Sequence, residues 1–258
     1  MNAYRLILIL AVACTLQACV TTSEPARPAP ASDEEASLAN LNLGAAYVRE
    51  GRPDLAIEAL ERALSIDPQL SVAHSTIAIA YDQLSSFELA EEHYRRATEL
   101  NRSDSGAANS YAVFLCRQGR WNDAEEYFIR AINDPRYPTP DIAMVNAGIC
   151  ARSSDDSGKA DEYFRAALSK NSALPAALSG LMELAYDSGN FLRARAFMQR
   201  YLDSQPATSS VLWMCVQIER ELDNPAAVQD CERRLVEQFP TSPEASRLQL
   251  SSDARTRR

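Results

Sequence analysis

Six cysteines and two histidines are the residues of this sequence whose types are best suited to chemistry. Thiolates act as nucleophiles, bind metals or form disulfides, and imidazoles carry protons or bind metals. His74 and His93 are too few for a histidine-rich metal site, and the sequence contains no HExxH motif. Neither histidine belongs to a recognisable pairing of nucleophile and base. We therefore interpret both histidines as structural, expect no metal, and predict no catalytic residue.

The amino-acid composition argues against nucleic acids and nucleotides as ligands. The 258 residues include 35 acidic and 26 basic side chains, and the resulting formal charge of −9 is poorly suited to a phosphate backbone. Only eight residues are glycine, and neither GxGxxG nor GxxxxGK[ST] occurs. We expect no cofactor, no small-molecule substrate and no nucleic acid, which makes an enzyme the weaker interpretation.

The N-terminus predicts export and lipidation. Leu6–Ala13 (LILILAVA) is a run of eight apolar residues, too short for a transmembrane helix of about 20 residues but typical of a signal peptide. The run leads to Leu16-Gln17-Ala18-Cys19, which resembles a bacterial lipobox. The resemblance implies cleavage after residues 1–18 and acyl chains on Cys19. The alternatives are an ordinary signal peptide with an incidental cysteine, or an uncleaved anchor.

The segment that begins at Cys19 predicts where the folded part lies. Asp directly after the lipidated cysteine usually marks inner-membrane retention in Gram-negative lipoproteins, so Val20 favours the outer membrane. Residues 19–36 are rich in Pro, Ala and Ser, and we predict a flexible tether there with a reach of roughly 50 Å. The folded part is then expected to face the periplasm while the acyl chains hold the membrane.

Beyond the tether, small residues recur every 34 positions. Gly44, Ala78 and Ala112 form one series, which a step of 36 extends to Gly148. This spacing resembles the tetratricopeptide repeat, whose two antiparallel helices cross closely where small side chains face each other. The resemblance implies an all-α superhelix (solenoid) of about six helix hairpins over residues 37–250, followed by a disordered tail at residues 251–258. The expected units are 37–70, 71–104, 105–140, 141–174, 175–208 and 209–240.

Turn-forming residues agree with these units. Gly51, Gly119 and Gly189 fall where the turns inside the hairpins are expected. Three prolines within residues 133–140 (NDPRYPTP) cannot continue a helix, so we predict a kinked loop between units three and four. The repeats account for nearly all of the chain after the tether, and no segment is left over for a catalytic domain.

Cys14 lies in the predicted signal peptide and Cys19 is the predicted lipidation site, so four cysteines remain in the folded part. Sequence alone allows three pairings of these four, and the repeat register suggests one of them. Cys116 and Cys150 lie near the same height on the first helices of units three and four. Cys215 and Cys231 lie on the sides of the sixth hairpin that meet. We predict the disulfides Cys116–Cys150 and Cys215–Cys231, which suit an oxidising compartment. Four buried free thiols are the alternative.

The first helices of such a solenoid line a concave face, where extended or helical peptides bind. Some tetratricopeptide proteins hold a terminal carboxylate with paired Lys and Asn, but here Asn42 and Asn146 lack the lysines. We therefore predict a hydrophobic groove for a segment of a partner protein, with packing of the chain's own tether as the alternative. By register the groove contains Leu41, Ala45, Val48, Ser75, Ile79, Asp82, Asn109, Val113, Val145 and Ile149.

Several segments resemble one family in particular, the type IV pilus biogenesis and stability lipoproteins called PilW or PilF. These segments are Asp134–Pro138, Asn146–Cys150, Leu212-Trp213 with Ile218-Glu219, and Phe239–Pro243. The resemblance implies a secretin pilotin, an outer-membrane lipoprotein that binds secretin subunits in the periplasm. Such a protein promotes outer-membrane localisation and multimerisation of the secretin, and it is a scaffold without enzymatic activity.

Two other interpretations share parts of this evidence. A general envelope-assembly or protease-adaptor lipoprotein would have the same anchor and groove but bind other clients. A periplasmic hydrolase regulated by repeats is the weaker alternative, because the sequence offers no nucleophile–base arrangement.

Overall fold

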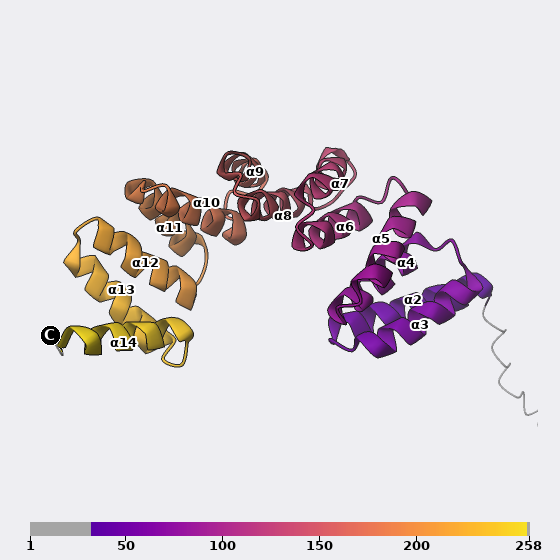
Figure 1. Cartoon of the computed structure of the whole chain (residues 1–258), viewed down its shortest axis with the longest axis horizontal. Coiled ribbons are helices and arrows are strands. Elements are labelled where there is room, and N and C mark those ends of the chain that lie inside the picture. The colour runs from indigo at the N-terminus through magenta and orange to yellow at the C-terminus, as the bar shows by residue number, and fades with distance from the viewer. Residues whose placement is uncertain (1–31, 257–258) are drawn as a thin grey trace, which may run out of the picture.

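The computed structural model describes residues 32–256, and within this range every regular element is a helix. The helices follow one another along an arch, with α2 at one end and α14 at the other (Figure 1). The predicted all-α tetratricopeptide-repeat superhelix is confirmed. The helices are α2 (Asp33–Arg49), α3 (Pro53–Ile66), α4 (Ser71–Gln83), α5 (Phe87–Leu100), α6 (Ser105–Arg117), α7 (Trp121–Asn133), α8 (Pro140–Ser153), α9 (Ser157–Lys170), α10 (Pro175–Asp187), α11 (Phe191–Ser204), α12 (Ser209–Glu221), α13 (Pro225–Gln238) and α14 (Pro243–Thr256).

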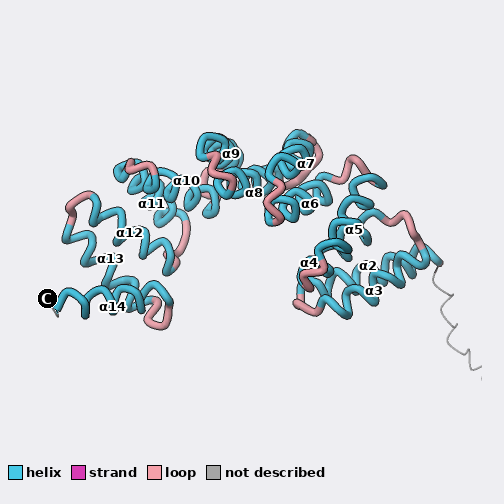
Figure 2. The backbone as a smooth tube through the Cα atoms, viewed as in Figure 1, coloured by secondary structure: helices cyan, strands magenta, loops and turns pink. Residues whose placement is uncertain are grey.

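The helices pair into six consecutive hairpins, from α2 with α3 to α12 with α13, and α14 follows the last of them. Each hairpin stacks on the next, so that the first helices form one layer and the second helices another. At the middle of the arch, α6 and α8 lie on the inner side and α7 and α9 on the outer side (Figures 1 and 2). The short loops leave little of this range outside helices (Figure 2).

Close helix crossings explain the small residues of the repeat. A Cβ added to Gly148 would lie 2.7 Å from the ring of Phe164, and one added to Gly44 would lie 2.5 Å from Leu60 Cγ. Both partners are buried, so neither can move aside without disturbing the core. Equivalent positions on the second helices are fully buried alanines, namely Ala56, Ala90, Ala124, Ala160 and Ala194.

The turns inside the hairpins require a left-handed backbone at one position. Gly51, Gly119 and Gly189 adopt φ values of +68°, +74° and +74°, which glycine accepts without a steric penalty. The other three hairpins place an L-residue at the same step of the repeat, with φ between +49° and +61°. These residues are Ser85, Asp155 and Asp223.

The N-terminal boundary corrects the predicted tether of residues 19–36. Helix α2 begins at Asp33 because Ser32 forms a capping box with Glu35. The Ser32 hydroxyl accepts the Glu35 N–H at 3.2 Å, and the Glu35 carboxylate accepts the Ser32 N–H at 3.0 Å. The last four residues assigned to the tether are therefore helical.

The C-terminal boundary also differs from the prediction. A disordered tail was expected at residues 251–258, but α14 continues to Thr256. Ala245 and Leu248 of α14 pack against Leu212 and Leu235, which covers the apolar end of the sixth hairpin. A solenoid needs such a terminal cap because its last repeat has no neighbour.

The connection between the third and fourth hairpins spans residues 134–139, within the predicted kinked loop. Asp134 ties it to the start of α6. Its carboxylate accepts the Arg136 N–H at 2.9 Å and the Ser105 hydroxyl at 2.8 Å. The backbone hydrogen bond from Arg136 is the main reason why the pKa of Asp134 lies below its ordinary value.

Candidate partner-binding surface

All ten residues predicted to line the groove lie on first helices, α2, α4, α6 and α8. Ile149 is 48% exposed, and seven others are half-buried and reach solvent. These seven are Ala45, Val48, Ser75, Ile79, Asp82, Asn109 and Val113.

Leu41 and Val145 depart from the prediction. They are 8% and 4% exposed and belong to apolar clusters between packed helices. Leu41 shares its cluster with Leu60 and Ile77, so its side chain stabilises the stacking of the first two hairpins. The assignment of these two residues to a binding groove is wrong, because they offer little surface to a partner.

Three exposed apolar residues were missed. Leu38, Val72 and Ile142 are 41%, 44% and 41% exposed and lie one to two turns before predicted groove residues. Ile142 and Ile149 are seven residues apart, which places them on the same side of α8. The same spacing could have been found by extending the repeat register. We call the resulting set the apolar face; it consists of Leu38, Val72, Ile79, Val113, Ile142 and Ile149.

Polar contacts between neighbouring first helices border the apolar face. Asp82 of α4 forms an ion pair with Arg117 of α6. Arg152 of α8 forms another with Glu183 of α10. These contacts join successive hairpins. Asp82 is predicted to face a partner, but its carboxylate is already paired with Arg117 within the protein.

One further contact links the middle of this layer. The Asn146 side-chain amide donates to Asn109 Oδ1 at 3.2 Å, between α8 and α6. The sequence lacks the lysines that would complete a carboxylate clamp with Asn146. Its amide is engaged within the protein, which agrees with an apolar mode of binding and not with a clamp.

The four cysteines come together in the predicted pairs. Cys116 and Cys150 join α6 to α8 with their Cα atoms 5.7 Å apart, and Cys215 and Cys231 join α12 to α13 at 6.0 Å. Both separations suit a disulfide. All four side chains are buried, at 8% exposure or less. The first pair lies near the C-terminal ends of α6 and α8, whereas the kinked loop meets the N-terminal ends of the same helices, and it links the third hairpin to the fourth.

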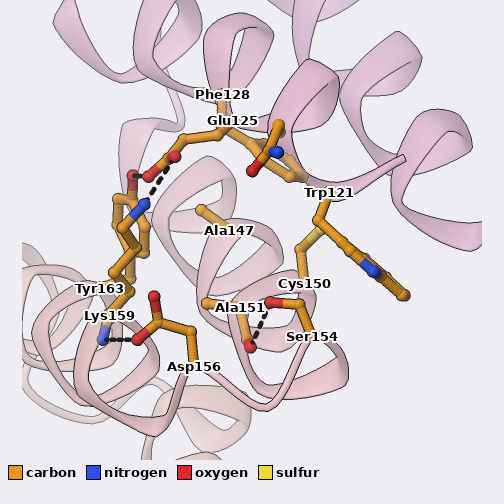
Figure 3. A pocket seen from close by; sticks show the side chains of 11 residues that line it. Trp121, Glu125, Phe128, Ala147, Cys150, Ala151, Ser154, Asp156, Lys159 and Tyr163 are labelled. Atoms are coloured by element: carbon orange, nitrogen blue, oxygen red, sulfur yellow. Dashed lines mark hydrogen bonds and ion pairs between the residues drawn. The ribbon is translucent and has the colours of Figure 1, made fainter. Parts of the chain in front are cut away.

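A small pocket lies next to Cys150, between α7, α8 and α9 (Figure 3). Its volume is about 70 Å³, room for little more than a few water molecules. Lys159 Nζ donates to Glu125 at 2.7 Å, and the Tyr163 hydroxyl donates to the same carboxylate at 3.3 Å. These contacts connect the second helices of units three and four.

Neither Lys159 nor Tyr163 is available as a general base in this pocket. The hydrogen bond to Glu125 raises the pKa of Lys159, and burial together with the Glu125 charge raises the pKa of Tyr163. At neutral pH the lysine is therefore charged and the tyrosine protonated, and neither can accept a proton. We interpret the pocket as a structural junction.

The two histidines meet, which the sequence did not predict. His74 of α4 and His93 of α5 are half-buried, with their Nδ1 atoms 3.0 Å apart. Burial is the main cause that lowers the pKa of both imidazoles, and Arg96 lowers that of His74 further. Both rings are therefore neutral at pH 7.

The predicted lipidation site, Cys19, lies outside the described residues, as does the whole predicted signal peptide. Between residues 32 and 256, no helix combines the length and apolar character that crossing a bilayer requires.

Family models and solved structures agree with this fold. Two models described as tetratricopeptide repeat match residues 34–103 and 76–139. No curated protein sequence matches the chain. Together with the stacked hairpins, these matches define the chain as a tetratricopeptide-repeat protein, a scaffold class that typically binds other proteins and does not catalyse reactions.

Two solved structures refine this class. The crystal structure of PilW, described as a widely conserved type IV pilus biogenesis factor, is 28% identical with a TM-score of 0.75, covering 82% of this chain and 97% of that one. PilF of Pseudomonas aeruginosa is 24% identical with a TM-score of 0.74, covering 85% and 99%, and this likeness concerns the fold. The chain is thus a tetratricopeptide-repeat solenoid that is similar in sequence and fold to PilW and similar in fold to PilF.

A more distant structure shares only the architecture. YrrB, described as a tetratricopeptide protein with an unusual peptide-binding site, is 14% identical with a TM-score of 0.56 and covers 75% of this chain. Its likeness shows that the stacking of hairpins is common to proteins of very different sequence.

Proposed function

We propose that this chain is an outer-membrane lipoprotein of type IV pilus biogenesis that acts as a pilotin. It binds secretin subunits in the periplasm and promotes their outer-membrane localisation and multimerisation. The observation that carries the proposal is the similarity to PilW, a type IV pilus biogenesis factor, over nearly the whole of that chain. The lipobox-like Leu16-Gln17-Ala18-Cys19 supports the anchor.

The mechanism rests on binding and position. The exposed residues of the apolar face offer a partner segment apolar area whose burial is favourable, at roughly 25 cal/mol per Å². Acyl chains on Cys19 hold the scaffold at the membrane, and the tether raises the effective concentration of a bound subunit there. Neighbouring subunits brought together in this way assemble faster, and no covalent step is needed.

Deletion of the gene tests the proposal. We expect loss of twitching motility and of assembled secretin, while other outer-membrane proteins remain at normal levels. General envelope defects with normal secretin would instead indicate a scaffold for other clients.

The anchor is tested separately with a Cys19→Ala variant in the deletion strain. We expect this protein to leave the membrane fraction and to restore secretin assembly poorly. A Cys14→Ala variant, altered within the predicted signal peptide, is the matched control and should fractionate with membranes. Unchanged membrane fractionation of Cys19→Ala would refute lipidation at this residue.

A further inference from the structure

The only two histidines of the chain are neighbours on the second hairpin. His74 lies on α4 and His93 on α5, with their ring centroids 5.1 Å apart and their planes inclined by 33°. They open into a cavity of about 320 Å³ that is also lined by Glu92, Arg95, Arg96 and Glu99. Solvent in this cavity therefore lies beside the two imidazole rings.

The hydrogen bond of His74 to the backbone fixes its tautomer. His74 Nε2 lies 3.2 Å from the carbonyl oxygen of Pro68, which can only accept a hydrogen bond. Nε2 therefore carries the proton, and in the neutral ring Nδ1 has a free electron pair directed at His93. Metal-binding histidines are held in the same way, because the other ring nitrogen usually donates to a carbonyl or carboxylate.

The distance between the two Nδ1 atoms suits adjacent ligands of one metal ion. Imidazole nitrogens bind first-row metals at about 2.0–2.1 Å, so two of them at a right angle lie about 2.9 Å apart and two at a tetrahedral angle about 3.3 Å. The observed 3.0 Å lies between these two values, so a metal ion could bind both nitrogens with only a small movement of the rings. Among first-row divalent metals, nitrogen ligands bind Cu²⁺ most tightly.

We propose that His74 and His93 form a binding site for a divalent transition metal, with Cu²⁺ as the preferred ion. Among residues 32–256 no group of three or more His, Cys, Asp and Glu side chains is arranged to hold a metal, so two imidazoles are the protein ligands and water completes the coordination. Without metal, His93 Nδ1–H donates to His74 Nδ1. Binding moves the His93 proton to Nε2, and both rings stay neutral.

The surroundings tolerate a bound cation. Arg95 forms an ion pair with Glu99 at 3.3 Å, which leaves Glu92 and Arg96 as the remaining charges of the cavity. Metal binding would clamp α4 to α5 and stabilise the second hairpin in proportion to the free metal concentration. Ions that prefer oxygen ligands, such as Ca²⁺ and Mg²⁺, should not bind here.

Calorimetric titration with Cu²⁺ tests the site. It uses the full chain in detergent, purified without a histidine tag and with any free thiols alkylated. We expect one equivalent of Cu²⁺ that His74→Gln and His93→Gln each weaken by at least about tenfold. Arg95→Gln is the matched control, because Arg95 lines the same cavity but is not a metal ligand. This variant should retain the wild-type affinity for Cu²⁺. Wild-type affinity in either histidine variant, or no binding by the wild type, would overturn the proposal.

Electron paramagnetic resonance of the wild-type protein gives a test that does not depend on the folding of variants. With one equivalent of Cu²⁺, we expect hyperfine structure from two imidazole nitrogens. A spectrum with one nitrogen ligand, or with oxygen ligands alone, would contradict the site even if Cu²⁺ binds.

Discussion

At the scale of single residues, the structure depends on a few positions where a larger side chain or an added charge would disturb the packing. Phe164 lies against both Gly148 of α8 and Gly180 of α10, so one ring joins the fourth hairpin to the fifth. The ring is 1% exposed and is therefore enclosed by closely packed core atoms. A single methyl group at either glycine therefore affects two hairpins.

We predict that Gly148→Ala lowers the free energy of unfolding by about 1–2 kcal/mol, because overpacking outweighs the better helix propensity of alanine. Gly158→Ala is the matched control, since its added Cβ would make only an ordinary contact, 3.5 Å from Asp156 Oδ1. The control should be neutral or slightly stabilising. Urea unfolding followed by circular dichroism measures both, and equal midpoints for the two variants would contradict the packing argument.

The histidine pair predicts a dependence of stability on pH in the metal-free protein. Burial lowers the pKa of both rings below the ordinary 6.5, so below about pH 6.5 the unfolded chain binds protons that the folded chain does not. Stability therefore falls as the pH decreases through that range and gains nothing further above it. Arg96 reinforces the effect at His74, whereas Glu92 opposes it at both rings.

Urea midpoints between pH 7.5 and 5.5 in the presence of EDTA measure this effect. The wild type should lose stability on acidification more steeply than the double variant His74→Gln/His93→Gln. Tyr81, whose ring stacks on His93, stays protonated throughout this range, because burial raises its pKa. Parallel curves for the two proteins would show that the imidazoles do not contribute.

At the scale of elements, the two cysteine pairs join helices in different ways. Cys116–Cys150 connects first helices of neighbouring units across a sequence separation of 34, whereas Cys215–Cys231 closes a single hairpin across 16. In the chain-entropy model each bond stabilises the fold by about 3–4 kcal/mol, and the longer loop gives the larger effect.

We predict that Cys116→Ala/Cys150→Ala lowers the free energy of unfolding by about 3–4 kcal/mol and makes the chain insensitive to reductant at that junction. Cys215→Ala/Cys231→Ala is the matched comparison, and its loss should be slightly smaller. Denaturant unfolding with and without dithiothreitol measures both. A wild-type midpoint that dithiothreitol leaves unchanged would mean that the thiols do not pair.

The helices could be predicted well from the sequence because helix packing in each repeat requires particular residue types at fixed positions. Close crossings demand Gly148 and its equivalents at fixed spacing, and left-handed turns favour Gly119. The start of α2 was misplaced because the Pro- and Ser-rich composition concealed the capping box of Ser32. The cap α14 was missed because it follows the last repeat and has no partner in the register.

The candidate surface was predicted less completely. Register identifies the helix side but not how far each side chain is covered by the next hairpin, so Leu41 and Val145 were assigned to the surface although they are buried. The contact of His74 with His93 depends on the packing of α4 on α5 across 19 residues, which periodicity does not describe.

At the scale of the whole molecule, the repeats produce an arch with two distinct surfaces (Figure 1). The first helices carry the apolar face and the second helices form the other layer. Exposed apolar residues also occur on second helices, and Leu192 of α11 is 67% exposed. Exposure alone therefore does not distinguish a binding surface. The proposed function requires that secretin subunits bind the first helices and not the second helices.

Binding of purified secretin subunits to the full chain tests this requirement most directly. Ile149→Asp places a charge on the apolar face and should weaken binding at least about tenfold, because a charge buried without a partner is unfavourable. Leu192→Asp introduces the same charge on a second helix, and this variant should bind secretin subunits with wild-type affinity. Wild-type affinity in Ile149→Asp, or an equal loss in both variants, would contradict the account.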